Sequence, residues 1–141
     1  MEKLLTKLIG DAGEHYVAFE LARRGASPAM LSTNTKGADI LATISGRKVV
    51  SIQVKASAGS NDPRTWAVGK KSTHPSPNFF YVFLNVWSDL NKQIECFIVP
   101  SEVVLNSVNW QASMPQFRMK TSAVSLYLNN WELILSELKS E

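Results

Sequence analysis

The spacing of apolar residues over the first 25 positions predicts a long amphipathic helix. Apolar side chains recur there at steps of three and four residues and form one stripe, made of Leu5, Leu8, Ile9, Ala12, Tyr16 and Phe19. Gly25 follows Arg23 and Arg24, as expected for a glycine that caps a helix whose last turn carries positive charge. We therefore expect this helix to end at Gly25.

The pattern then changes to segments that favour strands. Residues 29–33 form a short candidate strand, and the polar residues 34–37 predict a turn. Residues 38–44 and 47–55 predict a β-hairpin that turns at Ser45 and Gly46. Residues 79–86, FFYVFLNV, are continuously apolar, which is typical of a central strand buried on both faces, and residues 94–100 predict another strand.

Between these strands, residues 57–78 are rich in Gly, Ser, Asn, Pro and Lys and predict a long loop with one short strand around 66–68. A loop of this length in a compact domain is usually functional or mobile. Ser101 is a candidate cap for a short helix that follows Pro100. A final amphipathic helix is predicted at 130–139, with four side chains spaced for packing: Trp131, Ile134, Leu135 and Leu138. The order of elements predicts an α/β (α+β) fold.

Composition narrows the class of protein. The 141 residues, 45% hydrophobic and 19% charged, predict one globular domain spanning 1–141. We expect a cytoplasmic protein, because no apolar run approaches the ~20 residues that cross a membrane and charge interrupts the apolar opening segment too often for a secretory signal. The single Cys96 is predicted to be a small core residue. A net charge of +3 permits an anionic partner without demanding one.

Three polar residues stand out in the predicted hairpin: Asp39, Gln53 and Lys55. Side chains alternate along a strand, so Gln53 and Lys55 share a face. A turn at Ser45 and Gly46 would pair residue 44 with 47 and place Asp39 opposite Ile52, on the other face. A shift of one residue, through a bulge or a different loop, would bring Asp39 to Gln53 and Lys55. A joint site needs that shift.

Glu14 is a second acid that could join such a site. It lies at helical spacing from Val17 and Leu21 and should face partly inward. An inward carboxylate is costly unless it is paired, hydrogen-bonded or bound to metal. One alternative is a capping box in which Asp11 starts the helix and Glu14 reaches back to it. The unbroken apolar period from Leu5 favours one continuous helix instead.

These groups suit a divalent cation. Two carboxylates and the carbonyl oxygen of Gln53 are the hard oxygen ligands that Mg²⁺ prefers, and Mg²⁺ keeps waters and accepts phosphate oxygens. A lysine beside it could position an attacking water or stabilise negative charge on a phosphate. Each residue also has a plain alternative: Asp39 could close the preceding turn, Gln53 could be an edge-strand amide and Lys55 a solvated strand end.

An acid in a helix, then GADI, then an apolar strand that ends QVK resembles the PD-(D/E)XK nuclease superfamily, which includes restriction endonucleases and Holliday-junction resolvases. FFYVFLNV, CFIVPSEVV and NNWELI also resemble small members of it, so the resemblance covers most of the chain. It implies a three-layer, restriction endonuclease-like fold, a mixed sheet flanked by helices. It also implies hydrolysis of DNA phosphodiester bonds with Mg²⁺, or Mn²⁺ as an alternative. The implied catalytic residues are Glu14, Asp39, Gln53 and Lys55, with Glu14, Asp39 and Gln53 as metal ligands.

The sequence departs from the superfamily pattern at two positions. Ala38 replaces the proline of the motif, and Gln53 replaces an acid with a neutral carbonyl, which should weaken metal affinity. A second hypothesis is therefore a catalytically inactive module that keeps the nuclease fold and binds DNA or protein. By analogy with small nucleases, a homodimer is a further expectation.

DNA contacts are predicted for cations outside the hairpin strands. Positive charge there would bind phosphates without sequence preference, and a solvated loop is the alternative. The candidate residues are Lys36, Arg64, Lys70 and Lys71. Trp66, in the same long loop, could stack on a base, but the stronger expectation is that it anchors the loop to the core.

Overall fold

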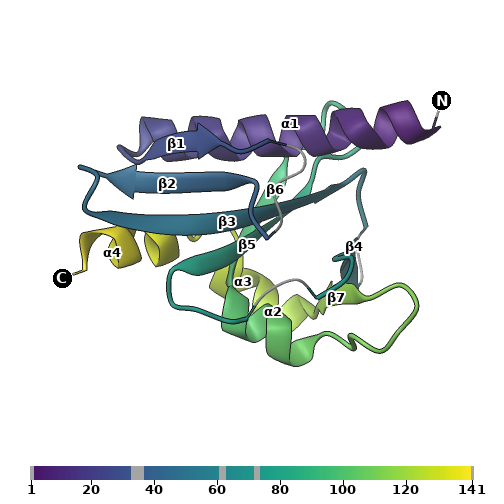
Figure 1. Ribbon diagram of the computed structural model, residues 1–141. Helices are drawn as coiled ribbons and strands as arrows, with labels where there is room; N and C mark the ends of the chain where they lie inside the picture. Colours follow the sequence, from purple (N-terminus) through teal and green to yellow (C-terminus); the bar gives the residue numbers. More distant parts are fainter. Residues whose placement is uncertain (1, 33–36, 61–62, 72–73, 141) are drawn as a thin grey trace.

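The computed structural model describes residues 2–32, 37–60, 63–71 and 74–140, and Figure 1 shows their arrangement. The main sheet has the order β1-β2-β3-β5-β6, and a second sheet pairs β4 with β7. The strands are β1 (Ser27–Met30), β2 (Ile40–Ile44), β3 (Lys48–Ser57), β4 (Arg64–Ala67), β5 (Phe79–Asn85), β6 (Glu95–Pro100) and β7 (Gln116–Met119). The helices are α1 (Glu2–Arg23), α2 (Ser101–Ser107), α3 (Val124–Tyr127) and α4 (Glu132–Lys139), with a 3₁₀ turn η1 (Thr121–Ala123).

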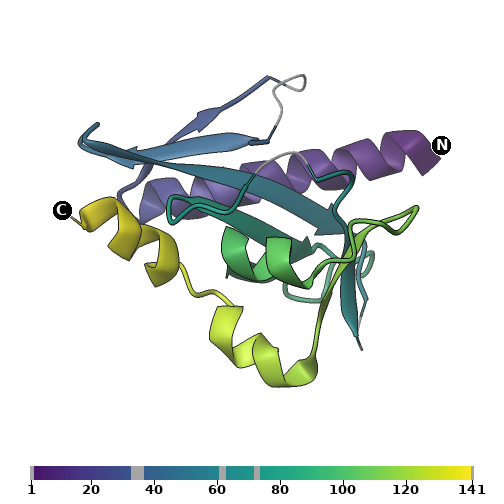
Figure 2. The same ribbon diagram turned by 60° about the horizontal axis from the view of Figure 1, so that its bottom comes forward.

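The predicted mixed sheet flanked by helices is confirmed. Strands β3 and β5 run parallel, and the other neighbours in the main sheet run antiparallel. One face of the sheet packs with side chains of α1 and α4, and the other packs with α2 and the β4–β7 pair. In Figure 2, α1 passes behind β3 while α2 lies in front of β5. All seven residues of β5 are buried, which confirms it as a central strand covered on both faces.

Helix α1 is continuous through residues 11–14, so Asp11 does not begin a helix, and it pairs instead with Lys7 one turn earlier. The predicted end of the helix is confirmed. Gly25 has a positive φ of 91°, and the Ala26 N–H donates to the Leu21 carbonyl at 3.0 Å, which closes the last turn as in a Schellman motif. No helix in the described part of the chain is long and apolar enough to cross a membrane.

The predicted apolar stripe of α1 is only partly the buried face. Val17 and Leu21 are fully buried, whereas Leu5, Leu8 and Phe19 are 60%, 54% and 59% exposed. The first turns of α1 lie beside the connection between β5 and β6 and leave Leu5 and Leu8 at the surface. There, Leu5 and Leu8 line a shallow apolar surface pocket together with Ile9, Ala12, Ala58, Val86, Trp87, Ser88 and Leu90.

A glycine allows α1 to approach the sheet closely. A Cβ atom added to Gly13 would lie 2.8 Å from the Cβ of Ala56 on β3, which is closer than real Cβ contacts come. Any larger residue would push the helix and the strand apart. The contact fixes the next residue, Glu14, beside the second half of β3.

The predicted hairpin register is wrong by one residue. Ile44 pairs with Lys48, not with residue 47, and Ile40 pairs with Ile52. The connection therefore has three residues instead of two, and both Ser45 and Gly46 adopt positive φ angles, of 57° and 71°. Three-residue hairpin loops commonly contain such a left-handed residue.

Strand β1 begins and ends earlier than the predicted 29–33, and residue 33 and the predicted turn at 34–36, including Lys36, lie outside the described residues. In the predicted long loop, β4 pairs with β7, a strand that the sequence pattern did not indicate. Trp66 anchors this region as expected: it is 2% exposed and its Nε1 donates to the Leu84 carbonyl at 2.9 Å.

The remaining predictions for the core are confirmed with one exception. Cys96 is fully buried, and the final helix buries Ile134, Leu135 and Leu138. Ser101, however, does not cap α2. It is the first helical residue, and its hydroxyl exchanges hydrogen bonds with the backbone of Ser76, because Pro100 already provides the extended residue before the helix.

Candidate functional site

Asp39 directly precedes β2, at a point where the neighbouring strand β3 continues past the first residue of β2. Its Oδ2 accepts a hydrogen bond from the backbone N–H of Val54 at 2.7 Å and another from Nε2 of Gln53 at 3.1 Å. A side-chain oxygen thus satisfies a strand N–H that has no β2 partner at this point. Asp39 and Gln53, which sequence reasoning could only bring together through a shift, are in contact.

The backbone explains how the contact forms. The Asp39 N–H donates to the Ile52 carbonyl at 2.8 Å, although the ladder pairs Ile52 with Ile40. Two residues of one strand therefore face one residue of the other, which is the arrangement of a β-bulge. The Asp39 carbonyl accepts from the Leu31 N–H on the opposite side, at 2.9 Å, which continues the β1–β2 pairing by one residue. The three-residue turn, not the bulge, supplies the one-residue shift, because the β2–β3 ladder extended by one residue pairs position 39 with Gln53.

Lys55 completes the trio on the same face of β3 as Gln53. Both side chains are partly buried, and their register partners on β5 are Tyr81 and Phe83. The positive charge of Lys55 acts to lower the pKa of Asp39, so the ammonium group lies within electrostatic reach of the carboxylate. Burial has the larger, opposite effect and leaves the pKa of Asp39 above its ordinary value.

Glu14 approaches from α1 and is partly buried, as its position with Val17 and Leu21 predicted. Burial raises the pKa of Glu14, and the negative charge of Asp39 raises it further. The two carboxyl groups are therefore close enough to repel each other when both are ionised. Such a pair favours a bound cation, because a cation removes the repulsion and replaces lost hydration.

The donor atoms fit a hard divalent cation that keeps part of its water shell. The described residues contain no cluster of three or more His, Cys, Asp or Glu side chains that could enclose a metal. Two carboxyl groups and the Gln53 amide are the side chains that offer oxygen atoms at this place. Oxygen donors of this kind, completed by water and phosphate oxygens, match the coordination habits of Mg²⁺.

The predicted DNA-contacting cations are placed differently from one another. Lys70 and Lys71 are exposed on the segment that links β4 to β5, and Lys36 lies outside the described residues. Arg64 is not in a loop but begins β4, where it forms a bidentate ion pair with Glu95, Nε to Oε1 at 3.0 Å and Nη2 to Oε2 at 2.7 Å. Its guanidinium group has a structural partner that the sequence gave no reason to expect.

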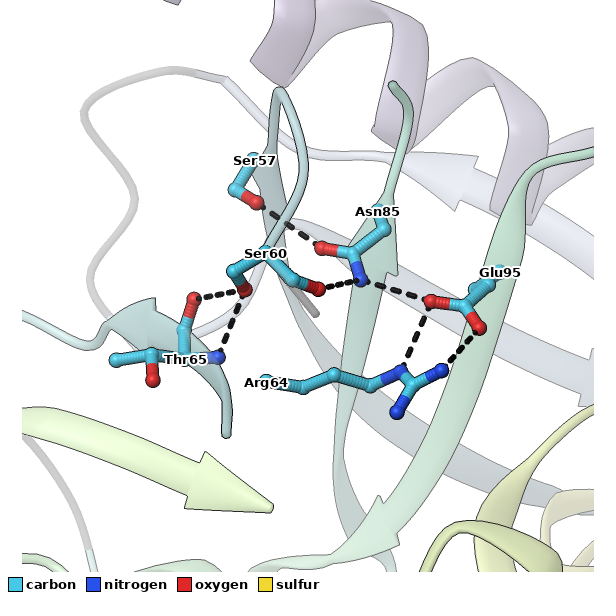
Figure 3. A network of polar contacts seen from close by, with 6 residues as sticks. All are labelled: Ser57, Ser60, Arg64, Thr65, Asn85 and Glu95. Carbon is cyan, nitrogen blue, oxygen red and sulfur yellow. Dashed lines mark hydrogen bonds and ion pairs between the residues drawn. The ribbon is translucent and has the colours of Figure 1, made fainter. Parts of the chain in front are cut away.

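That ion pair belongs to a polar network at the ends of four strands, shown in Figure 3. Asn85 is fully buried; its Nδ2 donates to the Ser60 carbonyl at 3.0 Å and to Glu95 Oε1 at 2.8 Å, and its Oδ1 accepts from the Ser57 hydroxyl at 3.1 Å. Ser57 lies two residues after Lys55, so the network fixes the end of the strand that carries the site. Sequence reasoning missed it, although a lone amide ending the apolar run of β5 was a signal.

Comparison with solved structures places this arrangement in a known fold. The chain is similar to a bacterial homing endonuclease, with a TM-score of 0.63 and 15% identity over 93% of this chain and 91% of that chain. It is also similar to the Holliday junction resolvase of the archaeal hyperthermophile Archaeoglobus fulgidus, with a TM-score of 0.53 and 13% identity over 88% and 97% of the two chains. Neither a protein-family model nor a curated protein matches the sequence. The chain therefore has the restriction endonuclease-like fold of PD-(D/E)XK nucleases, as its sequence motif predicted.

Proposed function

We propose that this protein is a metal-dependent endonuclease that hydrolyses phosphodiester bonds of DNA at Asp39, Gln53, Lys55 and Glu14. The observation that carries the proposal is the contact between Asp39 and Gln53, 3.1 Å from Oδ2 to Nε2, with Lys55 on the same face of the sheet. The fold shared with an endonuclease and a resolvase supports it. Residues distant in sequence meet here in a partly buried, charged group that a structural role alone does not require.

The proposed cofactor is Mg²⁺, with Mn²⁺ as an alternative. Asp39 and Glu14 would hold it through carboxylate oxygens, and Gln53 through its carbonyl oxygen. When bound, such an ion polarises a phosphate and makes a coordinated water more acidic. Because Gln53 contributes no charge, we expect weaker affinity than a site with three acids would have.

Around that ion, the side chains have separate tasks. Lys55 would hold the attacking water or stabilise negative charge that develops on the phosphate. The hydrogen bond from the Val54 N–H keeps the Asp39 carboxylate in place, 2.7 Å away. Lys70 and Lys71, together with Lys36, would bind backbone phosphates without regard to sequence.

A second candidate is a DNA- or protein-binding module without catalysis. The observation that favours it is the same hydrogen bond: the amide N–H of Gln53 already compensates part of the Asp39 charge without a cation. In that case, the protein would leave DNA uncut with or without metal, and replacing Lys55 would not change the cleavage assay.

Cleavage of supercoiled plasmid with Mg²⁺ or Mn²⁺, and with chelator, tests the proposal. We expect metal-dependent nicking that Lys55→Ala reduces by about 100-fold or more, the loss typical when a transition-state charge partner is removed. Lys139→Ala is the matched control, because it removes an exposed lysine of α4 and leaves the rate unchanged. Equal cleavage by both variants would place the activity elsewhere, and no metal-dependent cleavage would favour the binding module. Direct formation of linear product would further indicate that two copies act together.

A further inference from the structure

Tyr81 lies at the centre of β5 with its ring in the core, and its hydroxyl has no hydrogen-bond partner among the residues that the structure describes. The residue is 3% exposed. Its ring packs between two phenylalanines of the same strand, with centroids 5.1 Å from Phe79 and 5.7 Å from Phe83. Such packing needs only an aromatic ring, and phenylalanine would provide it equally well.

The hydroxyl group has no structural use in the described part of the chain. It makes no hydrogen bond there, whereas buried tyrosine hydroxyls usually find a partner. No side-chain nitrogen or oxygen that is fully buried among the described residues lacks a partner, so the Tyr81 hydroxyl must keep some contact with solvent. The small exposed part of this residue therefore includes its polar end.

The sheet register indicates where that polar end emerges. Tyr81 pairs with Gln53 of β3 on one side and with Val99 of β6 on the other. Val99 is fully buried beneath α2, and Phe79 and Phe83 close off both directions along β5. The neighbours on β3 are polar and partly exposed. The open direction for the hydroxyl is therefore toward β3, whose backbone runs one strand spacing, about 4.8 Å, from the backbone of β5.

We propose that the Tyr81 hydroxyl is a further substrate-contacting group, which donates a hydrogen bond to a phosphate oxygen of DNA bound at the Asp39–Gln53 site. This inference rests on the proposed function and extends it to a residue outside the motif. A phenol suits the task because its ordinary pKa, near 10, leaves it a neutral donor, and burial raises the pKa of Tyr81 further.

Tyr81→Phe isolates the hydroxyl, because the ring and its packing remain. We expect an unchanged or slightly higher free energy of unfolding and a fall in kcat/KM for DNA cleavage of about 10-fold or more, as for loss of one hydrogen bond to a charged group. Tyr16→Phe is the matched control, because Tyr16 packs on the opposite face of the sheet and should leave cleavage unchanged. Equal kcat/KM for wild type and Tyr81→Phe would overturn the inference.

A binding measurement separates failure of this inference from failure of the proposed function. The chain has three tyrosines, so ¹³Cζ-tyrosine labelling gives three NMR signals, and the Tyr81→Phe spectrum identifies one of them. In the Lys55→Ala protein, a DNA duplex should shift the Tyr81 signal and leave the Tyr16 signal in place. Binding of DNA with an unmoved Tyr81 signal would contradict the inference alone. A wild-type protein that neither cleaves nor binds DNA would overturn the proposed function, and this inference with it.

Discussion

The side chain of Gln53 donates a hydrogen bond to the carboxylate of Asp39 across β3 and β2, at 3.1 Å. The same carboxylate oxygen accepts the Val54 N–H, so the acid is held at two points by the strand that carries Lys55. This contact depends on the three-residue turn after Ile44, which moves the hairpin register by one residue. A regular two-residue hairpin would have kept the groups apart, and the local irregularity therefore creates the candidate site.

Restoring an acid at position 53 should strengthen metal binding. Gln53→Glu adds a charged oxygen ligand beside Asp39, and we expect at least tenfold tighter Mn²⁺ binding by calorimetry, together with faster cleavage. Without metal the variant should be less stable than wild type, because a further negative charge joins two carboxyl groups whose pKa values burial already raises. Gln93→Glu, on an exposed turn, is the control. Unchanged Mn²⁺ affinity in Gln53→Glu would show that position 53 is not a ligand.

The close approach of α1 to β3 predicts opposite effects for two glycines of one helix. Gly13→Ala should lower the free energy of unfolding by about 1–3 kcal/mol, because its Cβ would collide with Ala56. Gly10→Ala should raise it by about 0.5–1 kcal/mol, since nothing lies within 4 Å and alanine favours a helix. Urea denaturation of both variants checks this. Equal effects at the two positions would mean that α1 does not contact β3 at Gly13.

The ion pair of Glu95 predicts a pH dependence of stability. Hydrogen bonds from Arg64 lower the pKa of Glu95 below its ordinary value of 4.5, and Asn85 contributes in the same direction. The folded state therefore binds this proton less readily than the unfolded state. The resulting stability is present above pH 4.5 and is lost as the pH falls through the lowered pKa.

Glu95→Gln should remove that contribution. We expect the variant to lose about 1–3 kcal/mol of unfolding free energy at pH 7 and to show a flatter profile than wild type below the ordinary pKa of a glutamate. Glu102→Gln, an exposed residue of α2, should retain the wild-type profile. Parallel profiles for wild type and Glu95→Gln would contradict the role given to the Asn85 network.

The fold was predictable where one local pattern determines one element. The continuous apolar run of β5, the amphipathic period of α4 and the glycine after α1 each specify their structure, and the motif of Glu14, Asp39, Gln53 and Lys55 predicted the fold. The limit is long-range geometry. The period of α1 marks an apolar face but does not show which of its turns lie over the sheet, so the exposure of Leu5 and Leu8 could not be predicted.

The spatial arrangement of the site residues depended on information that the sequence pattern does not contain. Ser45 adopts a positive φ that is uncommon for serine, so the length of the turn, and with it the register, could not be derived. Strand β7 has only four residues and becomes a strand by pairing with the distant β4. Arg64 carries no mark in the sequence that distinguishes a partner of Glu95 from a DNA-contacting cation.

The most direct test of the central claim is the anomalous diffraction of Mn²⁺ in crystals of the protein. We predict one anomalous peak about 2.0–2.6 Å from oxygens of Asp39 and Gln53, the range of oxygen ligands to hard divalent cations, which disappears in Asp39→Asn. The account would be contradicted if the protein cleaves DNA with Mn²⁺ but its crystals, at saturating Mn²⁺, show no anomalous peak at Asp39.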